Sequence, residues 1–255
     1  MKIGIIGTGA IGGTIAKKLA AAGHQVKVNN AGQFRELSIK AKELGAVPAT
    51  ITEVIEVVDI VILSIPTAAV TQLPVNLFKN ISDDVVIVDT TNYYPFRDGV
   101  IEELQNGKVE SIWVSEQLGR PVIKAFNNLL AHTLQHGAKT AGEQGRIAMA
   151  ISGDDKTAKE KLASLVHDLG FDAVDAGTLS ESWKHQPGTP AYCTELSAPS
   201  LKQALAYAVK ENSAQSRDFA IQKFMDSTSP LSHTDTVALN RSLFSDLNLF
   251  SISQK

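Results

Sequence analysis

Short apolar runs alternate with amphipathic stretches over most of the chain. An apolar run of this kind is typical of a strand that is buried on both faces of a parallel sheet. The amphipathic stretches carry apolar residues at helical spacing, and glycines end several of them. The predicted strands span 3–6, 26–29, 47–49, 60–65, 85–88 and 121–126, and the predicted helices between them span 15–22, 34–44 and 51–58. This alternation predicts an α/β fold, a doubly wound parallel (Rossmann) sheet with right-handed crossovers.

The alternation continues as a second α/β unit and then changes. The predicted elements of this unit are a helix near 129–134, a polar loop at 137–145, a strand at 147–151, a helix at 155–169 and a strand at 171–174. Beyond Gly177, prolines bracket a loop, and helical stretches follow at 199–210 and 214–225. The tail from 227 keeps apolar residues at a spacing that indicates a docked helix or a partner-binding segment. We therefore expect a Rossmann domain over 1–178 and a smaller, mainly helical region over 179–255 that covers the substrate side.

The first predicted strand ends in a glycine-rich loop. Gly7, Gly9 and Gly12 stand at the spacing G-x-G-x-x-G, in which the first glycine allows a tight turn and the second lets the backbone approach a pyrophosphate. The third glycine lets the following helix pack closely on the strand, so the phosphates meet a helix N-terminus. The loop predicts a dinucleotide site that comprises Gly7, Thr8, Gly9, Ala10, Ile11 and Gly12.

The end of the second predicted strand selects between the two nicotinamide dinucleotides. An Asp or Glu at this place binds the ribose hydroxyls of NAD, whereas cations and neutral donors accept the 2′-phosphate of NADP. This strand ends in Asn29 and Asn30, with no carboxylate in the selecting position. Asn30 can donate to a phosphate, and Arg35 at the start of the next helix can reach it as a charged partner. The sequence therefore favours NADP over NAD, and a solvated helix residue is the alternative for Arg35.

Polar segments follow three further strands, at the edge where a doubly wound sheet binds its ligand. Ser64, Ile65 and Pro66 stand at the end of the fourth strand, and Thr91 and Asn92 follow the fifth. We expect these segments to border the second ribose and the nicotinamide, although ordinary turns are the alternative.

The polar segment after the sixth strand supplies the catalytic candidates. Lys124 and Asn127 come at this strand end and are candidates to face the nicotinamide. The alternative there is a helix N-cap by Asn127 or Asn128.

Charge and cysteine content narrow the classes of partner. The net charge is −3, and Lys and Arg are scattered without a basic face, which argues against nucleic acid. Cys193 is the single cysteine, no leader precedes the first strand, and no apolar run reaches the about 18 residues of a membrane helix. These features predict a soluble, cytoplasmic protein whose partner is a small molecule, and leave a homodimer open as its assembly. His132 and His136 lack the Glu of a zinc-protease motif, so no metal site is expected.

The order of these motifs resembles that of the NADP oxidoreductases dependent on the deazaflavin coenzyme F420. The resemblance covers about residues 1–180. It rests on the glycine loop and on the segments 64–66, 89–92, 122–127, 152–155 and 175–180. The family resemblance implies hydride transfer from C4 of NADPH to a flat acceptor stacked against it, with a deazaflavin or flavin as co-substrate. In that family a Ser-Arg pair and a Lys hold the 2′-phosphate, and the matching positions are Asn30, Ala31 and Arg35. Ala31 departs from the pattern, which leaves Arg35 as the phosphate cation.

Two other classes of function are consistent with the same residues. A carbonyl or imine reductase related to hydroxyacid dehydrogenases or pyrroline-carboxylate reductases needs a positioned proton donor, and Lys124 is the candidate that the sequence offers. A non-catalytic NADP sensor would keep the cofactor loop and use the apolar C-terminal segment to bind a partner. The region after Ser180 extends beyond the core of the resembled family, so the acceptor itself is left open.

Overall fold

The computed structural model describes residues 1–247, 249 and 250. In this part of the chain, six parallel strands form one sheet in the order β3-β2-β1-β4-β5-β6. The strands are β1 (Lys2–Ile6), β2 (Gln25–Asn29), β3 (Val47–Pro48), β4 (Ile60–Leu63), β5 (Val86–Asp89) and β6 (Ile123–Lys124). The strand order reverses between β1 and β4, which is the point where such sheets bind ligands.

A parallel pair of strands continues this sheet at its β6 edge. β7 (Ala148–Ile151) pairs with β8 (Asp172–Asp175), and Lys124 of β6 forms an antiparallel bridge with Ser152 at the end of β7. The main-chain N–H groups of Lys124 and Ser152 donate to each other's carbonyls at 2.8 and 3.0 Å. The ends of β6 and β7 are therefore adjacent, and each can contribute to one site.

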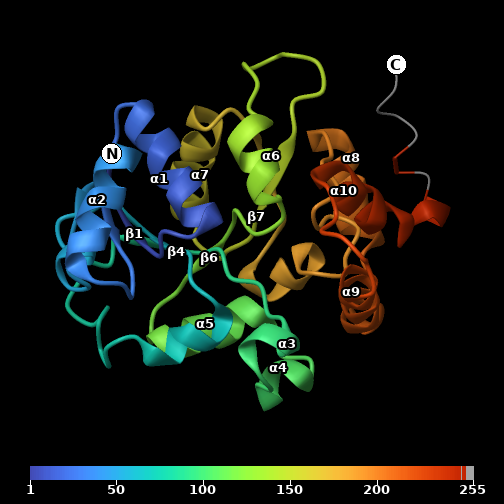
Figure 1. The fold of residues 1–255 in the computed structure, drawn as a ribbon, viewed down its shortest axis with the longest axis horizontal. Coiled ribbons are helices and arrows are strands. Elements are labelled where there is room, and N and C mark those ends of the chain that lie inside the picture. Colours follow the sequence, from blue (N-terminus) through green and yellow to red (C-terminus); the bar gives the residue numbers. More distant parts are fainter. Residues whose placement is uncertain (248, 251–255) are drawn as a thin grey trace.

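Helices cover both faces of the sheet (Figure 1). One core cluster joins the sheet to α1 (Ala10–Ala21), α2 (Phe34–Leu44), α6 (Ala131–His136) and α7 (Lys156–Asp168). The other face packs against α5 (Glu110–Leu118), beside the short helices α3 (Pro95–Asp98) and α4 (Glu102–Gln105). Ile3, Ile5, Ile60 and Ile62 are fully buried, as expected for strands between two helical layers.

Local sequence signals explain the ends of several helices. α2 ends at Gly45, which adopts the left-handed conformation at φ +70° that favours glycine. α7 begins after Asp155, whose carboxylate accepts from the N–H of Ala158 at 3.0 Å as an N-cap. The end of α2 and the start of α7 thus follow from local sequence signals.

The C-terminal region is helical. It consists of a 3₁₀ helix at Leu179–His185, α8 (Ala198–Tyr207), α9 (Lys210–Met225), α10 (His233–Ser242) and a 3₁₀ turn at Ser245–Leu247. α8 packs on β7 and β8, where Leu201 and Ala204 join Ala148 and Val174 in a shared core. Figure 1 shows α8, α9 and α10 together at the end of the molecule opposite α2. None of the described helices is long and apolar enough to cross a bilayer.

The observed fold confirms the predicted class, a Rossmann sheet followed by a mainly helical region. Two local predictions were incomplete. The helix expected at 51–58 is a 3₁₀ turn at Glu53–Ile55, because the following Glu56 is extended. The helix α5 was not predicted, although Trp113 and Val114 on it are buried against the sheet.

Candidate active site

The glycine loop between β1 and α1 has the geometry of a phosphate cradle. A Cβ on Gly7 would lie 2.0 Å from the carbonyl O of Ser64, and one on Gly12 would lie 2.1 Å from the carbonyl O of Gly7. A Cβ on Gly9 would meet nothing within 4 Å. Gly7 and Gly12 therefore hold the loop against the end of β4, while the backbone at Gly9 borders open space. This arrangement fits a pyrophosphate approaching the main chain.

The start of α1 adds donors to the same place. The first amide to bond into the helix is that of Gly13, which donates to the carbonyl of Gly9 at 2.9 Å. The preceding amides of Ala10, Ile11 and Gly12 have no carbonyl of an earlier turn to reach. Free amides and the positive end of the helix dipole attract a phosphate.

The selecting end of β2 lies directly beside this loop. The Asn30 side chain donates to the hydroxyl of Thr8 at 2.7 Å and accepts from the N–H of Gly32 at 2.9 Å. The Asn29 amide donates to the carbonyl of Ala49 at 2.9 Å and so ties β2 to the segment after β3. Arg35 is exposed in the first turn of α2. Lys27 is engaged elsewhere, since its ammonium donates to the carbonyls of Glu53 and Glu56.

The ends of β4 and β5 carry buried polar atoms that no described residue satisfies. Ser64 and Ile65 abut the Gly7 turn, and the exposed Pro66 begins the next 3₁₀ helix. The hydroxyls of Thr67 and Thr91 are buried without a hydrogen-bond partner in the described part of the chain. Buried hydroxyls almost always have a partner, so both can bond to a ligand bound at this edge.

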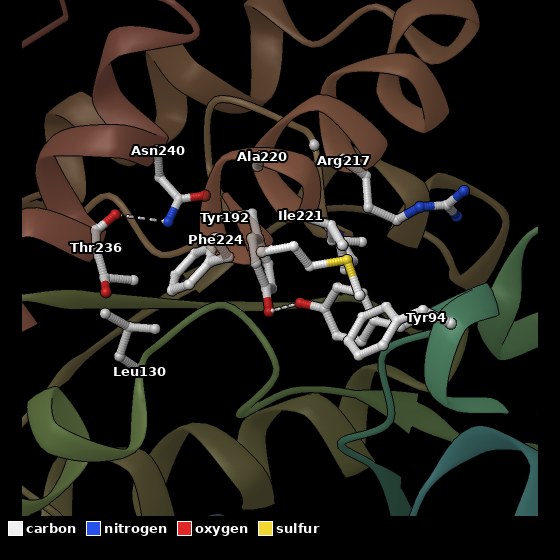
Figure 2. Close-up of a pocket in the computed structure, with 13 residues that line it drawn as sticks. Tyr94, Leu130, Tyr192, Arg217, Ala220, Ile221, Phe224, Thr236 and Asn240 are labelled. Carbon is white, nitrogen blue, oxygen red and sulfur yellow. Dashed lines mark hydrogen bonds between the residues drawn. The ribbon is translucent and has the colours of Figure 1, made fainter. Parts of the chain in front are cut away.

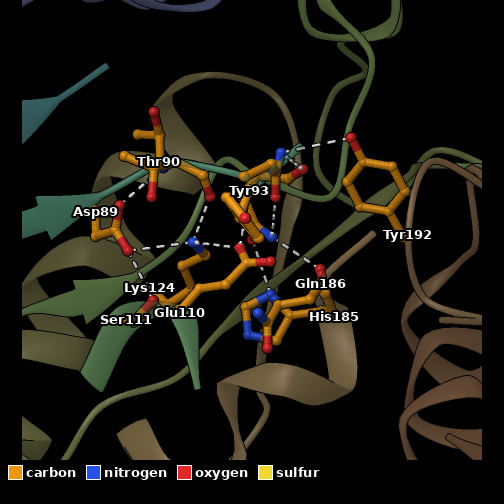
Figure 3. Close-up of polar contacts among 12 residues, drawn as sticks. Asp89, Thr90, Tyr93, Glu110, Ser111, Lys124, His185, Gln186 and Tyr192 are labelled. Carbon is orange, nitrogen blue, oxygen red and sulfur yellow. Dashed lines mark hydrogen bonds and ion pairs between the residues drawn. The ribbon is translucent and has the colours of Figure 1, made fainter. Parts of the chain in front are cut away.

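A buried ion cluster holds the loops after β5 and β6 (Figure 3). The ammonium of Lys124 lies 3.1 Å from the Asp89 carboxylate and 4.0 Å from that of Glu110, and it also donates to the carbonyl of Thr91. Asp89 further accepts from the Ser111 hydroxyl at 2.7 Å. Burial raises the pKa of Glu110, and the charge of Lys124 partly offsets that rise. The Lys124 side chain has no exposed surface, and its role as a proton donor stays a prediction.

A second polar network joins Asn127 to the C-terminal region. The ring of His185 lies between the Ser152 hydroxyl, 2.9 Å from Nε2, and Oδ1 of Asn127, 2.8 Å from Nδ1. Nδ2 of Asn127 donates to Oδ1 of Asn92 at 3.1 Å, and Asn92 in turn donates to the Tyr192 hydroxyl at 3.4 Å. Burial, and secondarily the charge of Lys124, lower the pKa of His185 to about 3. His185 is therefore a neutral, fully buried member of the site.

An apolar cavity of about 370 Å³ opens beside this network (Figure 2). Its lining joins the loops after β5 and β6, the segment after His185, α9 and α10. Aromatic and aliphatic side chains dominate that lining. They include Tyr94, Phe96, Leu130, Tyr192, Ile221, Phe224 and Met225. The Tyr94 and Tyr192 hydroxyls lie 2.5 Å apart among them, and Figure 2 shows the two groups facing one another. Asn240, Thr236 and Arg217 complete the lining.

The main chain at Gly188 determines how closely α9 approaches the rest of the cavity. Gly188 has φ +83°, and a Cβ there would lie 2.0 Å from the carbonyl O of Ser213 and 2.6 Å from the N of Arg217. Both partners belong to α9. The helix therefore rests directly on the backbone of residue 188.

Sequence reasoning did not assign the roles that several residues of this site have in the structure. Asp89 and Glu110 hold Lys124, His185 organises the amide network, and α9 and α10 wall the cavity. One signal for the ion pair was present, because Asp89 and Lys124 are opposite charges at the ends of adjacent apolar strands. Cys193, by contrast, is a buried free thiol whose pKa burial raises to about 12, which fits a structural role.

The fold, the glycine loop and the polar strand ends define an NAD(P)-dependent oxidoreductase. The model of the family "NADP oxidoreductase coenzyme F420-dependent" matches residues 2–93. The Escherichia coli (strain K12) protein YjhV is 33% identical over 110 residues, which are 43% of this chain and 80% of YjhV. The chain belongs to the family of coenzyme F420-dependent NADP oxidoreductases.

Solved structures show the same fold. A hypothetical protein from Sinorhizobium meliloti has a TM-score of 0.65 and 29% identity, over 77% of this chain and 95% of its own. A protein from Arthrobacter sp. FB24, provisionally assigned as an F420-dependent NADP reductase, has a TM-score of 0.58 and 24% identity, over 71% of this chain and 87% of its own. At that identity the second likeness supports the fold alone.

Proposed function

We propose that this protein is an NADP(H)-dependent reductase that passes hydride to a planar acceptor held in the apolar cavity. A deazaflavin, a flavin or a quinone-like molecule is an acceptor of this kind. The observation that carries the proposal is the position and lining of the cavity. Its walls combine Tyr94 and Leu130, from the loops after β5 and β6, with aromatic and aliphatic side chains of α9. Those loops lie at the sheet edge where the nicotinamide of a Rossmann enzyme is bound.

The cofactor half of the proposal assigns NADP to the glycine loop. Gly7, Gly9 and Gly12 with Thr8, Ala10 and Ile11 cradle the pyrophosphate. Asn29 and Asn30 border the adenosine ribose, and Arg35 supplies the cation for the 2′-phosphate. Ser64, Ile65, Pro66, Thr91 and Asn92 border the nicotinamide half. When bound, NADPH supplies a hydride from C4 of its nicotinamide.

The protein's own contribution to such a transfer is placement and exclusion of water. Hydride passes between two rings that are held face to face, and this transfer needs little acid-base catalysis. The rigidity of the cavity walls, which hold the acceptor ring in place, therefore matters most. Lys124 is buried in its ion cluster, and we assign it the task of fixing the loop that carries Thr91 and Asn92. Asn127 connects that loop to His185. In this division residues 1–178 bind the cofactor, and 179–255 cover the acceptor.

One observation keeps a carbonyl or imine reductase as the second candidate. The pair of Tyr94 and Tyr192 hydroxyls places one donor in the cavity, and reduction of an isolated carbonyl or imine needs a donor at the reacting oxygen or nitrogen. The two candidates differ in the acceptors that they turn over.

Stopped-flow loss of NADPH absorbance against a panel of acceptors tests the proposal. Rapid oxidation with F420, FMN or a naphthoquinone supports it, and oxidation with carbonyls or imines alone favours the second candidate. Binding of NADPH without oxidation by any member of the panel would overturn both. The variant Phe224→Trp tests the place of the acceptor, because the larger side chain narrows the cavity. We expect this variant to oxidise NADPH more slowly with every acceptor and to bind NADPH with unchanged affinity.

A further inference from the structure

The side chains between Ser152 and the cavity form one continuous chain of hydrogen bonds. In order, its members are Ser152, His185, Asn127, Asn92, Tyr192 and Tyr94. The chain crosses from β7 through the loops after β6 and β5 to the segment after His185. It ends at the tyrosine pair that lines the cavity.

Main-chain carbonyls fix the direction of this chain, because a carbonyl only accepts. Nδ2 of Asn127 donates to the carbonyl of His185 at 2.8 Å, so Oδ1 of Asn127 is the acceptor for the imidazole. His185 is neutral and therefore carries its hydrogen on Nδ1, which leaves Nε2 to accept from Ser152. Nδ2 of Asn92 donates to the carbonyl of Asn127 at 3.0 Å, which likewise fixes Asn92 as a donor toward Tyr192.

The tyrosine pair at the end of this chain holds two hydroxyl hydrogens, and the bond between Tyr94 and Tyr192 uses one of them. The donation from Asn92 polarises Tyr192 to donate onward to Tyr94, since hydrogen bonds in a chain strengthen one another. In that direction the hydroxyl hydrogen of Tyr94 is the one not used within the pair, and Tyr94 lines the mainly apolar cavity.

We infer that the Tyr94 hydroxyl donates a hydrogen bond to a carbonyl oxygen of the acceptor and so positions the acceptor in the cavity. This inference rests on the proposed function and names a residue that recognises the acceptor at its site. A conjugated carbonyl matches both features of the cavity, because its ring is flat and apolar and its oxygen accepts one hydrogen bond. A hydrocarbon of the same shape would leave the Tyr94 donor unsatisfied.

The same hydrogen bond assists the reduction. A hydride that adds to a conjugated carbonyl compound brings an electron pair, which moves through the conjugated system onto the carbonyl oxygen. The donated hydrogen bond of Tyr94 stabilises that developing charge, and a proton from water completes the two-electron reduction. Burial raises the pKa of Tyr94, so the hydroxyl keeps its hydrogen and acts as a donor across the neutral range.

Binding of a matched pair of ligands tests the inference without turnover. The probes are 1,4-naphthoquinone and naphthalene, which share a ring system and differ in the carbonyl oxygens, and the readout is calorimetric binding to the protein without cofactor. Tyr94→Phe is expected to weaken naphthoquinone binding by about tenfold and to leave naphthalene binding within about twofold. The matched control is Tyr207→Phe, the same chemical change at an exposed tyrosine of α8, with no effect on either ligand.

The outcomes separate this inference from the proposed function. If Tyr94→Phe weakens the binding of both ligands equally, or does not weaken the binding of naphthoquinone, Tyr94 is not the donor. Either result would leave the proposed hydride transfer intact. Failure of both ligands to compete with F420 or FMN for the cavity would instead overturn the proposed acceptor site. Tyr192→Phe gives a further check, because it removes the onward donation but keeps the Tyr94 hydroxyl. We expect it to weaken naphthoquinone binding less than Tyr94→Phe does.

Discussion

The ammonium of Lys124 lies 3.1 Å from the carboxylate of Asp89, and neither side chain is exposed to solvent. The two residues are register partners at the ends of β6 and β5. Such a pair stabilises little as a unit but is costly to break, because one charge is left buried alone. Here the ion pair anchors the strand end that leads into Thr91 and Asn92.

Removing the cation should therefore destabilise the fold strongly. Lys124→Met is expected to lower the free energy of unfolding by about 3–5 kcal/mol, because Asp89 loses its counter-charge. Urea denaturation measures the change. The double variant Lys124→Met/Asp89→Asn is expected to recover part of the loss. If Lys124→Met is folded and reduces carbonyl acceptors at the normal rate, Lys124 is not the proton donor.

Substitutions at two glycines of the cofactor loop should affect different properties, cofactor binding at Gly9 and the stability of the fold at Gly12. Gly9→Val keeps the fold, because its backbone is extended and its Cβ meets open space, but the side chain fills the phosphate cradle. We expect NADPH and NADH binding to fall by more than about a hundredfold with an unchanged melting temperature. Gly12→Ala is the contrasting variant, since its Cβ would collide with the carbonyl of Gly7. A lowered melting temperature for Gly9→Val would contradict this reading of the loop.

Arg35 should discriminate between the two dinucleotides. Arg35→Ala is expected to weaken NADPH binding by about tenfold or more, the equivalent of one charge-assisted hydrogen bond, and to leave NADH binding within about twofold. Fluorescence titration of both reduced cofactors gives the ratio. Lys40→Ala, a neighbouring exposed cation on α2, is the control and should change neither affinity. An equal loss for both cofactors in Arg35→Ala would exclude the 2′-phosphate assignment.

His185 should make the fold sensitive to acid. The folded protein holds the pKa of His185 at about 3, whereas an unfolded histidine titrates near about 6.5. Between these values the unfolded chain binds the additional proton, so the free energy of unfolding falls as the pH falls. The free energy of unfolding falls by up to about 1.4 kcal/mol per pH unit, and this loss is complete near pH 3. Above about pH 6.5 the contribution is complete.

Comparison with His185→Gln isolates this contribution, because all carboxylates are common to both proteins. Urea denaturation at pH 7.5, 6.0 and 5.0 should give a steeper loss of stability for the wild type than for the variant. Parallel slopes would show that another group carries the acid sensitivity.

Local signals predicted the elements of the N-terminal sheet well. α2 begins at Phe34 and ends at Leu44 as predicted, because an apolar stripe and a left-handed Gly45 define it within one segment. The loop and strand ends follow equally from short motifs. The network beside the apolar cavity had no such signal. Asn127 and His185 are 58 residues apart in the chain, and Asn92 and Tyr192 are 100 apart. Contacts of that separation arise only when β6, β7 and the C-terminal helices pack together.

The direct contact of α9 with Gly188 has a consequence for how the acceptor range of this protein can change. A methyl group at residue 188 would collide with the main chain of α9, so either the helix or the backbone at residue 188 would have to move. The helix carries Phe224 and Ile221, so a shift of the helix would reshape the cavity, while the glycine loop, far from that contact in the sequence, would stay as it is. Under the proposed function, a change at one residue would then alter the range of acceptors without altering cofactor binding.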